Sequence, residues 1–192
     1  MDCYVVDTSV FTNPEIFRQF GEDAIEALSD FIELAKNAQG RFYMPSSTYQ
    51  ELGKMREMSN VAASFQTWVS VRSPRKHQLQ VPSQMLYEFV EEVRMRIDQG
   101  LRIAEEHTKL AGEGTPENVG QLVHRLRQRY REALRQGLLD STEDLDAVLL
   151  ALELDATLVS ADYGMRIWAD KFGVKLVDPA NLRSIMENLS GV

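Results

Sequence analysis

Short apolar runs alternate with amphipathic stretches near both ends of the chain. Four of these runs are rich in β-branched and aromatic residues: DCYVVD, RFYMP, ATLVSAD and VKLVDP. Such runs are typical of buried strands in a parallel sheet. A fifth stretch, QTWVSVRSP, fits either a strand or the end of a helix. Because strands alternate with helical patterns, we predict an α/β domain whose central parallel sheet has helices on both faces.

Helix start signals support this alternation. Asn13 precedes Pro14 in NPEIFRQF, which is the order of an N-cap and a first helical residue. Ser47 and Gln50 have the spacing of a capping box in PSSTYQELGKM. Ser141 is placed to cap a later helix, STEDLDAVLLALEL.

Residues 83–139 follow a different pattern. Two long helical patterns are joined there by a segment with Gly112, Gly114 and Pro116, and no strand pattern lies between them. We therefore predict that a helical hairpin (83–139) is inserted into one domain made of 1–82 and 140–192.

Charge is unevenly distributed over the 192 residues. The net charge of −8 is the sum of −2 in 1–82, 0 in 83–139 and −6 in 140–192. An acid cluster in a near-neutral chain is either a cation site or a solvated face. Because Cys3 is the only cysteine, a disulfide framework is excluded. No apolar stretch is long enough to cross a membrane, and the first predicted strand begins without a basic leader. We expect a soluble, cytoplasmic protein with no membrane partner.

Two acids end predicted strands. Asp7 closes the first apolar run, and Asp162 closes LVSAD. Each could simply cap the following helix. Ligands of open parallel sheets, however, bind at the carboxyl edge of the strands, so two such acids, with more acids nearby, favour a common site.

The further acids lie at the start of the late apolar helix. Glu143 and Asp144 fit first-turn positions, where carboxylates are favoured by the helix dipole. Asp146 lies beside AVLLAL and needs a partner or a metal ion. Asp140 shares a face with Asp144 if the helix starts early, whereas Asp144 and Asp146 project about 200° apart.

Glu51 lies on the helix after RFYMP, which would bring it to the same sheet edge as Asp7. Gathered carboxylates select Mg²⁺ or Mn²⁺. The chain has no glycine-rich phosphate loop, no His or Cys ligand cluster and no nucleophile elbow. This chemistry indicates phosphodiester hydrolysis by a metal-activated water, with the Thr8 and Ser9 hydroxyls holding water or a metal-bound oxygen.

The set VVDTSVFTN, MPSSTYQEL, DLDAVLLAL and LVSADYGMRIWA resembles the PIN-domain nucleases. The motifs RSPRKHQLQVP, GLRIAEEHT and RQRYREALRQGLLDS extend the resemblance, almost end to end, to HARP, the minimal protein-only RNase P family. This resemblance implies a PIN-like three-layer domain that removes the 5′ leader from precursor tRNA and leaves a 5′-phosphate. It also implies a homo-oligomer built from dimers through the inserted helices, in a large, twelve-subunit assembly.

The resemblance assigns the acids residue by residue. Asp7, Asp146 and Asp162 match the PIN pattern, and Asp144 and Asp140 match further HARP acids. Glu51 falls where PIN proteins place a Glu, and which of the late acids ligate metal stays open. Two alternatives remain: another PIN ribonuclease, such as a toxin, and a non-catalytic RNA-binding partner of an RNA ligase.

Basic residues gather just before the late acids. Residues 120–137 hold five arginines against Glu132 alone. On a helical wheel an apolar arc (119–134) is bordered by two arginine pairs, and we expect the arc to pack on the preceding helix or on a second subunit. A solvated charged face is the alternative. The planar guanidinium group of arginine can donate two hydrogen bonds to phosphate oxygens. We therefore predict that RNA is bound by basic side chains of this chain: Arg125, Arg129, Arg127, Arg131, Arg75 and Lys76.

Overall fold

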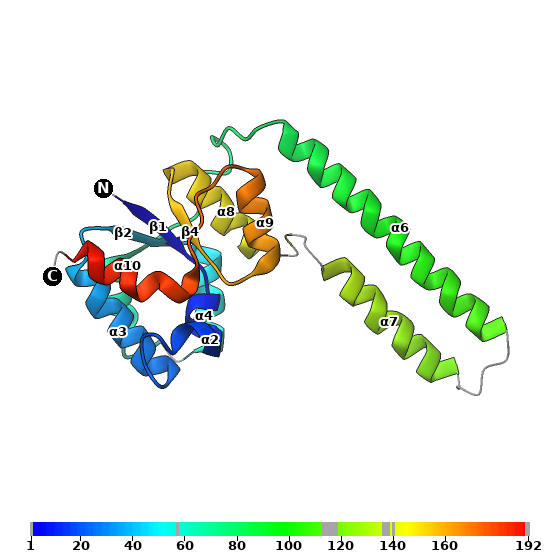
Figure 1. Ribbon diagram of the computed structural model, residues 1–192, viewed down its shortest axis with the longest axis horizontal. Coiled ribbons are helices and arrows are strands. Elements are labelled where there is room, and N and C mark those ends of the chain that lie inside the picture. Colours follow the sequence, from blue (N-terminus) through cyan, green and yellow to red (C-terminus); the bar gives the residue numbers. More distant parts are fainter. Residues whose placement is uncertain (1, 57, 113–118, 136–138, 140, 191–192) are drawn as a thin grey trace. The chain divides into compact units, whose positions relative to one another are not determined.

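The computed structural model describes residues 2–56, 58–112, 119–135, 139 and 141–190 (Figure 1). The chain divides into two compact units. The first unit is Met1–Gln80 with Ser141–Val192, and the second is Val81–Asp140. The predicted ligand Asp140 lies outside the described residues.

The first unit is built on a four-stranded parallel sheet with the order β3-β2-β1-β4. Its strands are β1 (Cys3–Val6), β2 (Arg41–Met44), β3 (Val69–Val71) and β4 (Thr157–Val159). The predicted parallel sheet is therefore confirmed. Helix α5 (Ala62–Trp68) ends directly before β3, so QTWVSVRSP contains both a helix end and a strand.

The strand predicted in VKLVDP is wrong. Leu176 makes an isolated parallel bridge to Leu158, and the chain then turns into the 3-10 helix η1 (Pro179–Asn181). Asp178 caps η1 by accepting a hydrogen bond from the Ala180 N–H (3.0 Å). Proline has no N–H to continue a ladder, so pairing stops here.

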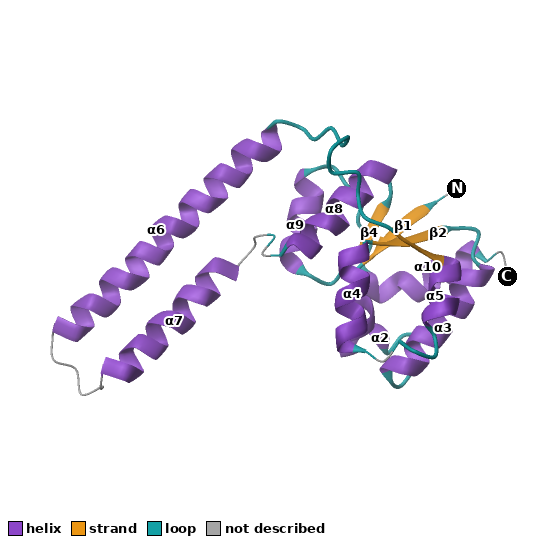
Figure 2. Ribbon diagram, turned by 180° about the vertical axis from the view of Figure 1, so that it is seen from behind, coloured by secondary structure: helices purple, strands orange, loops and turns teal. Residues whose placement is uncertain are grey.

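The other helices of this unit surround the sheet (Figure 2). They are α1 (Ser9–Thr12), α2 (Pro14–Phe17), α3 (Ala24–Asn37), α4 (Ser46–Met55), α8 (Thr142–Leu154), α9 (Tyr163–Lys171) and α10 (Leu182–Leu189).

Strand alternation distributes the core over both faces of the sheet. Tyr4 and Val6 belong to the main core, which is formed with α3, α4, α5 and α10. Val5, between them, is fully buried on the opposite face, where α8 packs against β1. Helices thus cover both faces, as the predicted three-layer arrangement requires.

Two of the three predicted helix caps are confirmed. Asn13 accepts a hydrogen bond from the Glu15 N–H (2.9 Å), and Ser141 accepts one from the Asp144 N–H (3.0 Å). The capping box at Ser47 is wrong. The N-cap of helix α4 is Pro45, two residues earlier, so Ser47 is the second residue of the helix and its hydroxyl donates to Asp146 on α8 (2.8 Å).

The second unit is a pair of helices, α6 (Gln84–Gly112) and α7 (Val119–Arg135). They approach closely at Gly100, where an added Cβ would lie 2.5 Å from the Tyr130 ring. The apolar arc of α7 is only partly covered: Leu122 is buried, but Val119 is 75% exposed. No helix among the described residues is long and apolar enough to span a membrane.

Candidate active site

Asp7 is a buried carboxylate fixed at the carboxyl end of β1. Its backbone N–H donates to Val159 O on the adjacent strand β4 (3.1 Å). Its Oδ2 accepts hydrogen bonds from the Ser160 hydroxyl (2.9 Å) and the Ser9 N–H (3.2 Å), and Thr8 Oγ1 donates to Oδ1 (3.4 Å). The side chains and backbone after β1 therefore hold the Asp7 carboxylate in one orientation.

Asp162 is joined to Asp7 through Ser160. The Ser160 Oγ donates to Asp7 and accepts from the Asp162 N–H (3.0 Å). Asp162 Oδ1 caps α9 by accepting from the Met165 N–H (2.7 Å), and the residue is exposed. Asp162 therefore caps a helix and also lies at the same sheet edge as Asp7.

Ser160 was missed in the sequence. It is fully buried within the apolar run LVSAD, two residues before Asp162. The signal in the sequence that could have identified Ser160 was a small polar residue at the end of a buried apolar strand. Ser9 completes this network, since its hydroxyl accepts from the Ala161 N–H (2.9 Å) and ties the end of β1 to the segment after β4.

Glu51, on α4, lies within electrostatic reach of two other acids. Burial raises the pKa of its carboxyl group, and the negative charges of Asp7 and Glu143 raise it further, while Lys54 lowers it. Helix α4 packs against α8, which carries Glu143 in its first turn. The sequence assigned Glu143 only a helix-dipole role; the fold also brings its charge to Glu51.

Asp146 takes partners from the protein itself. It is buried, its Oδ2 accepts from the Ser47 hydroxyl (2.8 Å), and its Oδ1 pairs with Lys76 Nζ (2.6 Å). Asp144 is half-buried in the first turn of the same helix. The structure therefore places Asp146 in an ion pair with Lys76.

The donor chemistry at this edge fits a hard divalent cation. The carboxylates of Asp7, Glu51 and Glu143 interact unfavourably, and a cation among them would relieve that repulsion. In the part of the chain that the structure describes, no three His, Cys, Asp or Glu side chains are already arranged to hold a metal ion. The fit therefore rests on the kind and charge of the ligands.

Comparison with known proteins assigns the chain to a family. A family model described as "PINc domain ribonuclease" matches residues 3–190. The chain belongs to this family.

Three relatives of this PINc ribonuclease, each named RNA-free ribonuclease P, match over nearly their full length. The protein of Halorhodospira halophila is 55% identical, over 98% of this chain and 91% of its own. That of Nitrosococcus oceani is 51% identical (99% and 96%), and that of Thermococcus onnurineus is 41% identical (97% and 94%). The resemblance to the protein-only RNase P family is confirmed.

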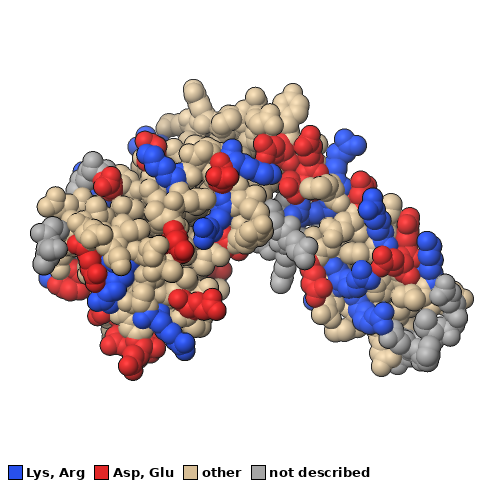
Figure 3. Space-filling model, in the orientation of Figure 1, with Lys and Arg blue, Asp and Glu red and all other residues tan. Residues whose placement is uncertain are grey.

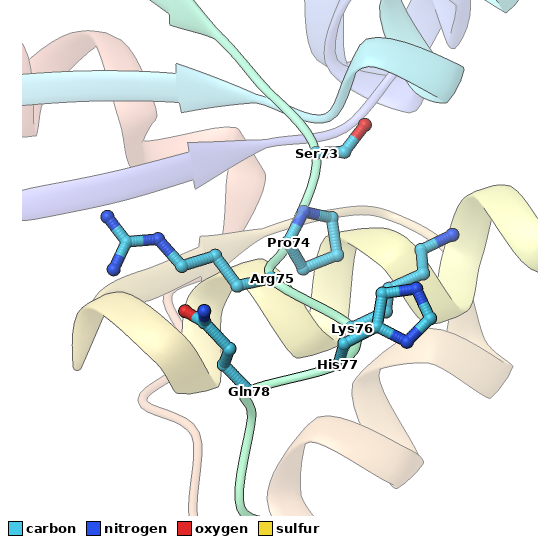
Figure 4. Close-up of a pocket in the computed structure, with 6 residues that line it drawn as sticks. All are labelled: Ser73, Pro74, Arg75, Lys76, His77 and Gln78. Atoms are coloured by element: carbon cyan, nitrogen blue, oxygen red, sulfur yellow. The ribbon is translucent and has the colours of Figure 1, made fainter.

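The predicted RNA contacts of this PINc ribonuclease lie in two places. Arg75 and Lys76 belong to the segment after β3, where a cavity of about 510 Å³ is lined by Ser73, Pro74, Arg75, Lys76, His77 and Gln78 (Figure 4). Both side chains contact acids of α8: Arg75 Nε lies 3.7 Å from Glu153 Oε1, and Lys76 pairs with Asp146.

The remaining predicted contacts lie on α7. Arg129 pairs with Glu106 of α6 (2.7 Å), and both side chains are about half-exposed. Arg127 and Arg131 line a cavity of about 330 Å³ on this helix. Basic and acidic side chains are interspersed on the visible face of this unit (Figure 3). Because Arg129 already pairs with Glu106, a phosphate bound at Arg129 would compete with that ion pair.

Proposed function

We propose that this protein is an RNA-free ribonuclease P, a metal-dependent endonuclease that removes the 5′ leader from precursor tRNA and leaves a 5′-phosphate. The observation that carries the proposal is the joined pair Asp7 and Asp162, held through Ser160 at a sheet edge where the Asp7 charge also acts on Glu51. Relatives with that name support it, among them one that is 55% identical over 98% of this chain.

Mg²⁺ or Mn²⁺ is the proposed cofactor. When bound, it would lower the pKa of a water molecule and stabilise the charge that develops on the phosphodiester. Asp7, Glu51, Asp144, Asp146 and Asp162 are the proposed ligands of this chain, and the charge that Glu143 exerts on Glu51 supports Glu143 as a further candidate. Asp140 stays a predicted ligand. Ser160, Ser9 and Thr8 would keep Asp7 oriented, so that little reorganisation is needed when the cation enters.

The alternatives are less well supported. A compact toxin-like nuclease is expected to lack the α6–α7 hairpin. The relatives named RNA-free ribonuclease P match over nearly the whole chain, which includes that hairpin. A non-catalytic partner of an RNA ligase would not need to retain acids at both strand ends. Both alternatives predict that the protein yields no mature tRNA 5′ end.

The hairpin supplies the proposed assembly surface. Four apolar residues of α6 share one face by their spacing and are each more than half exposed: Leu86, Val90, Ile97 and Leu101. An apolar stripe of this kind on a water-soluble unit favours a protein partner. We assign it to a second copy of this chain in the proposed dimers, from which the larger, twelve-subunit assembly would be built. A cytoplasmic location is part of the same proposal.

The test of activity is incubation of precursor tRNA, labelled on either side of the cleavage site, with the protein and Mg²⁺. The expected products are a released leader and a mature tRNA with a 5′-phosphate. Cleavage within the tRNA body, or none, would contradict the proposal.

The test of assembly is Ile97→Glu, compared with Ile25→Glu on α3 of the first unit. Ile97 and Ile25 are similarly exposed, at 62% and 57%. We expect light scattering to show a smaller particle for the first variant and an unchanged one for the second. Equal masses for both variants and the wild type would contradict the assigned surface.

A further inference from the structure

Helix α9 buries one side in the α/β unit and leaves the opposite side at the surface. It contacts α8 (Figure 2), and its buried residues fall within an arc of about 140°: Gly164, Met165, Trp168 and Ala169. Tyr163 and Arg166 lie outside this arc and, being three residues apart, are neighbours on the other side of the helix. Their side chains are therefore not committed to the core.

Tyr163 is an exposed aromatic residue beside an acid of the candidate site. It directly follows Asp162 and is the first residue of α9. Tyr163 is 73% exposed, and among the described residues of the first unit the next most exposed large hydrophobic residue is Ile25, at 57%. Single exposed apolar residues are common on protein surfaces. Next to Asp162, however, the ring offers a flat apolar face to whatever the acids act on.

Arg166 is a half-buried cation without a partner. Among the described residues its guanidinium group forms no ion pair or hydrogen bond, even with Asp170 one turn further along α9. Three other half-buried arginines of the same unit do have acceptors: Arg56, Arg72 and Arg183. A guanidinium group carries five N–H donors, and those of Arg166 are available to a ligand.

Arg166 lies one helical turn from Asp162. Its backbone N–H donates to Asp162 O (3.1 Å), so the two residues follow each other along one side of the helix. Side chains of a helix lean towards its N-terminus, which directs Arg166 towards the turn that carries Asp162 and Tyr163. Asp162 is joined to Asp7 through Ser160. The cation and the ring therefore border the acidic edge where α9 begins.

An unpaired nucleotide suits both groups. The guanidinium group can bind its phosphate, and the tyrosine ring can stack on its base. Stacking requires a base that is free of its neighbours, as in single-stranded RNA. In precursor tRNA the bases after the cleavage site are paired in the acceptor stem, whereas the leader before it is open to such contacts. The chemistry of Tyr163 and Arg166 therefore selects the leader side.

We infer that Tyr163 and Arg166 bind the leader nucleotide next to the cleavage site, with Tyr163 stacked on its base and Arg166 bound to its phosphate. This inference rests on the proposed function. It makes affinity depend on the part of the RNA that is removed, in contrast to contacts with the tRNA body. Because every base has a π-face, the contact accepts any leader sequence.

Binding without metal tests the stacking contact. Affinity is measured by fluorescence anisotropy in EDTA for precursor tRNA and for the same tRNA without its leader. Tyr163→Ala should weaken binding of the precursor about 10-fold and leave binding of the leaderless tRNA unchanged. Tyr163→Phe should bind as the wild type does, because the ring is kept. A precursor whose last leader nucleotide is abasic should bind the wild type and Tyr163→Ala equally.

A KCl series in the same assay tests the phosphate contact. Arg166→Ala should weaken binding of the precursor about 5-fold and reduce the salt slope by about 0.7, the value for one phosphate of a single strand. Arg166→Lys should restore the slope and part of the affinity, because the charge is kept and the planar fork is lost.

Trp68→Ala and Arg41→Ala are the matched controls. Trp68 is a 41% exposed aromatic residue directly before β3, and Arg41 is the exposed first residue of β2. Both lie at the amino edge of the parallel sheet, opposite the edge that carries Asp7. Neither control should change the affinity for either RNA. Tyr163→Ala and Arg166→Ala variants that bind the precursor as the controls do would overturn the inference.

The remaining outcomes are separated by RNA preference, particle mass and cleavage. An equal loss of affinity for precursor and leaderless tRNA would refute a leader contact. A smaller particle for Tyr163→Ala in light scattering would make this face a contact between subunits and would also refute the inference. Wild-type protein that binds the leader through Tyr163 but never cleaves precursor tRNA would instead contradict the proposed function alone.

Discussion

The α/β unit and the hairpin bury their large side chains very differently. In the α/β unit Phe31 contacts the rings of Phe11, Phe20, Phe42 and Phe65, and all five are almost fully buried. In the hairpin, Leu86, Tyr87, Phe89 and Ile97 are at least half exposed. Two helices have too few faces to enclose one another's apolar residues. The α/β unit is therefore stabilised by its own core, whereas the exposed apolar face of the hairpin is the surface that we propose a second copy of the chain covers.

The largest effect should come from a matched pair of phenylalanine truncations. Phe31→Ala leaves a cavity among four aromatic rings and should lower the free energy of unfolding by about 3–5 kcal/mol. Phe89→Ala, at a 50% exposed position of α6, should cost less than about 1 kcal/mol under conditions that separate the subunits. Urea unfolding measures both. Equal losses would show that the hairpin encloses a core of its own.

The acidic edge is expected to be essential for cleavage and dispensable for folding. Asp7→Ala and Asp162→Ala should each reduce cleavage of precursor tRNA about 100- to 1,000-fold, the scale for loss of one essential charge-stabilising group. Each substitution removes one negative charge from acids that repel one another, so the melting temperature in EDTA should be unchanged or higher. Asp155→Asn is the control, because Asp155 is an exposed acid at the left-handed end of α8, a conformation that Asn accepts. Near-normal turnover of either alanine variant at low Mg²⁺ would refute the assignment.

The hairpin is expected to act in binding. Arg125→Ala combined with Arg129→Ala should weaken precursor tRNA binding about 10-fold and reduce the salt slope by about 2, because two phosphate contacts are lost. Arg94→Ala with Arg102→Ala removes the same charge from exposed positions of α6 and should have a smaller effect. Anisotropy over a KCl series compares them. Identical binding curves for the two double variants would show that the loss of affinity reflects total charge and not specific contacts at Arg125 and Arg129.

The smallest effect concerns Glu51. Its pKa is raised in the folded protein by burial and by the charges of Asp7 and Glu143. Its protonated form therefore stabilises the fold below the unfolded pKa, and that contribution is lost as pH rises through the folded pKa. In EDTA, Glu51→Gln should remove this loss and give a slightly higher melting temperature than the wild type near neutral pH. Melting temperatures from pH 4 to 8 provide the measurement, and a steeper loss of stability in the variant would count against the assigned repulsion.

The sequence predicted those features that depend on neighbours along the chain. Asp7 follows a β-branched run, Ser141 precedes an apolar helix, and two long amphipathic patterns meet at glycines and proline. Strand ends, helix caps and hairpins are set by local propensity and by the period of apolar residues. The same local rules failed at Ser47, where α4 begins directly after Pro45, and at VKLVDP, which leads into the 3-10 helix that begins at Pro179.

Only the tertiary structure decided which side chains meet. Ser160 joins Asp7 to Asp162, Glu51 feels the charge of Glu143, and Lys76 pairs with Asp146 across 70 positions of sequence. A periodic pattern states which face of an element is buried but not which residue of another element lies opposite. That choice depends on the packing of α4 against α8 and of α8 against β1, and it decides which side chain lies opposite a buried acid such as Asp146.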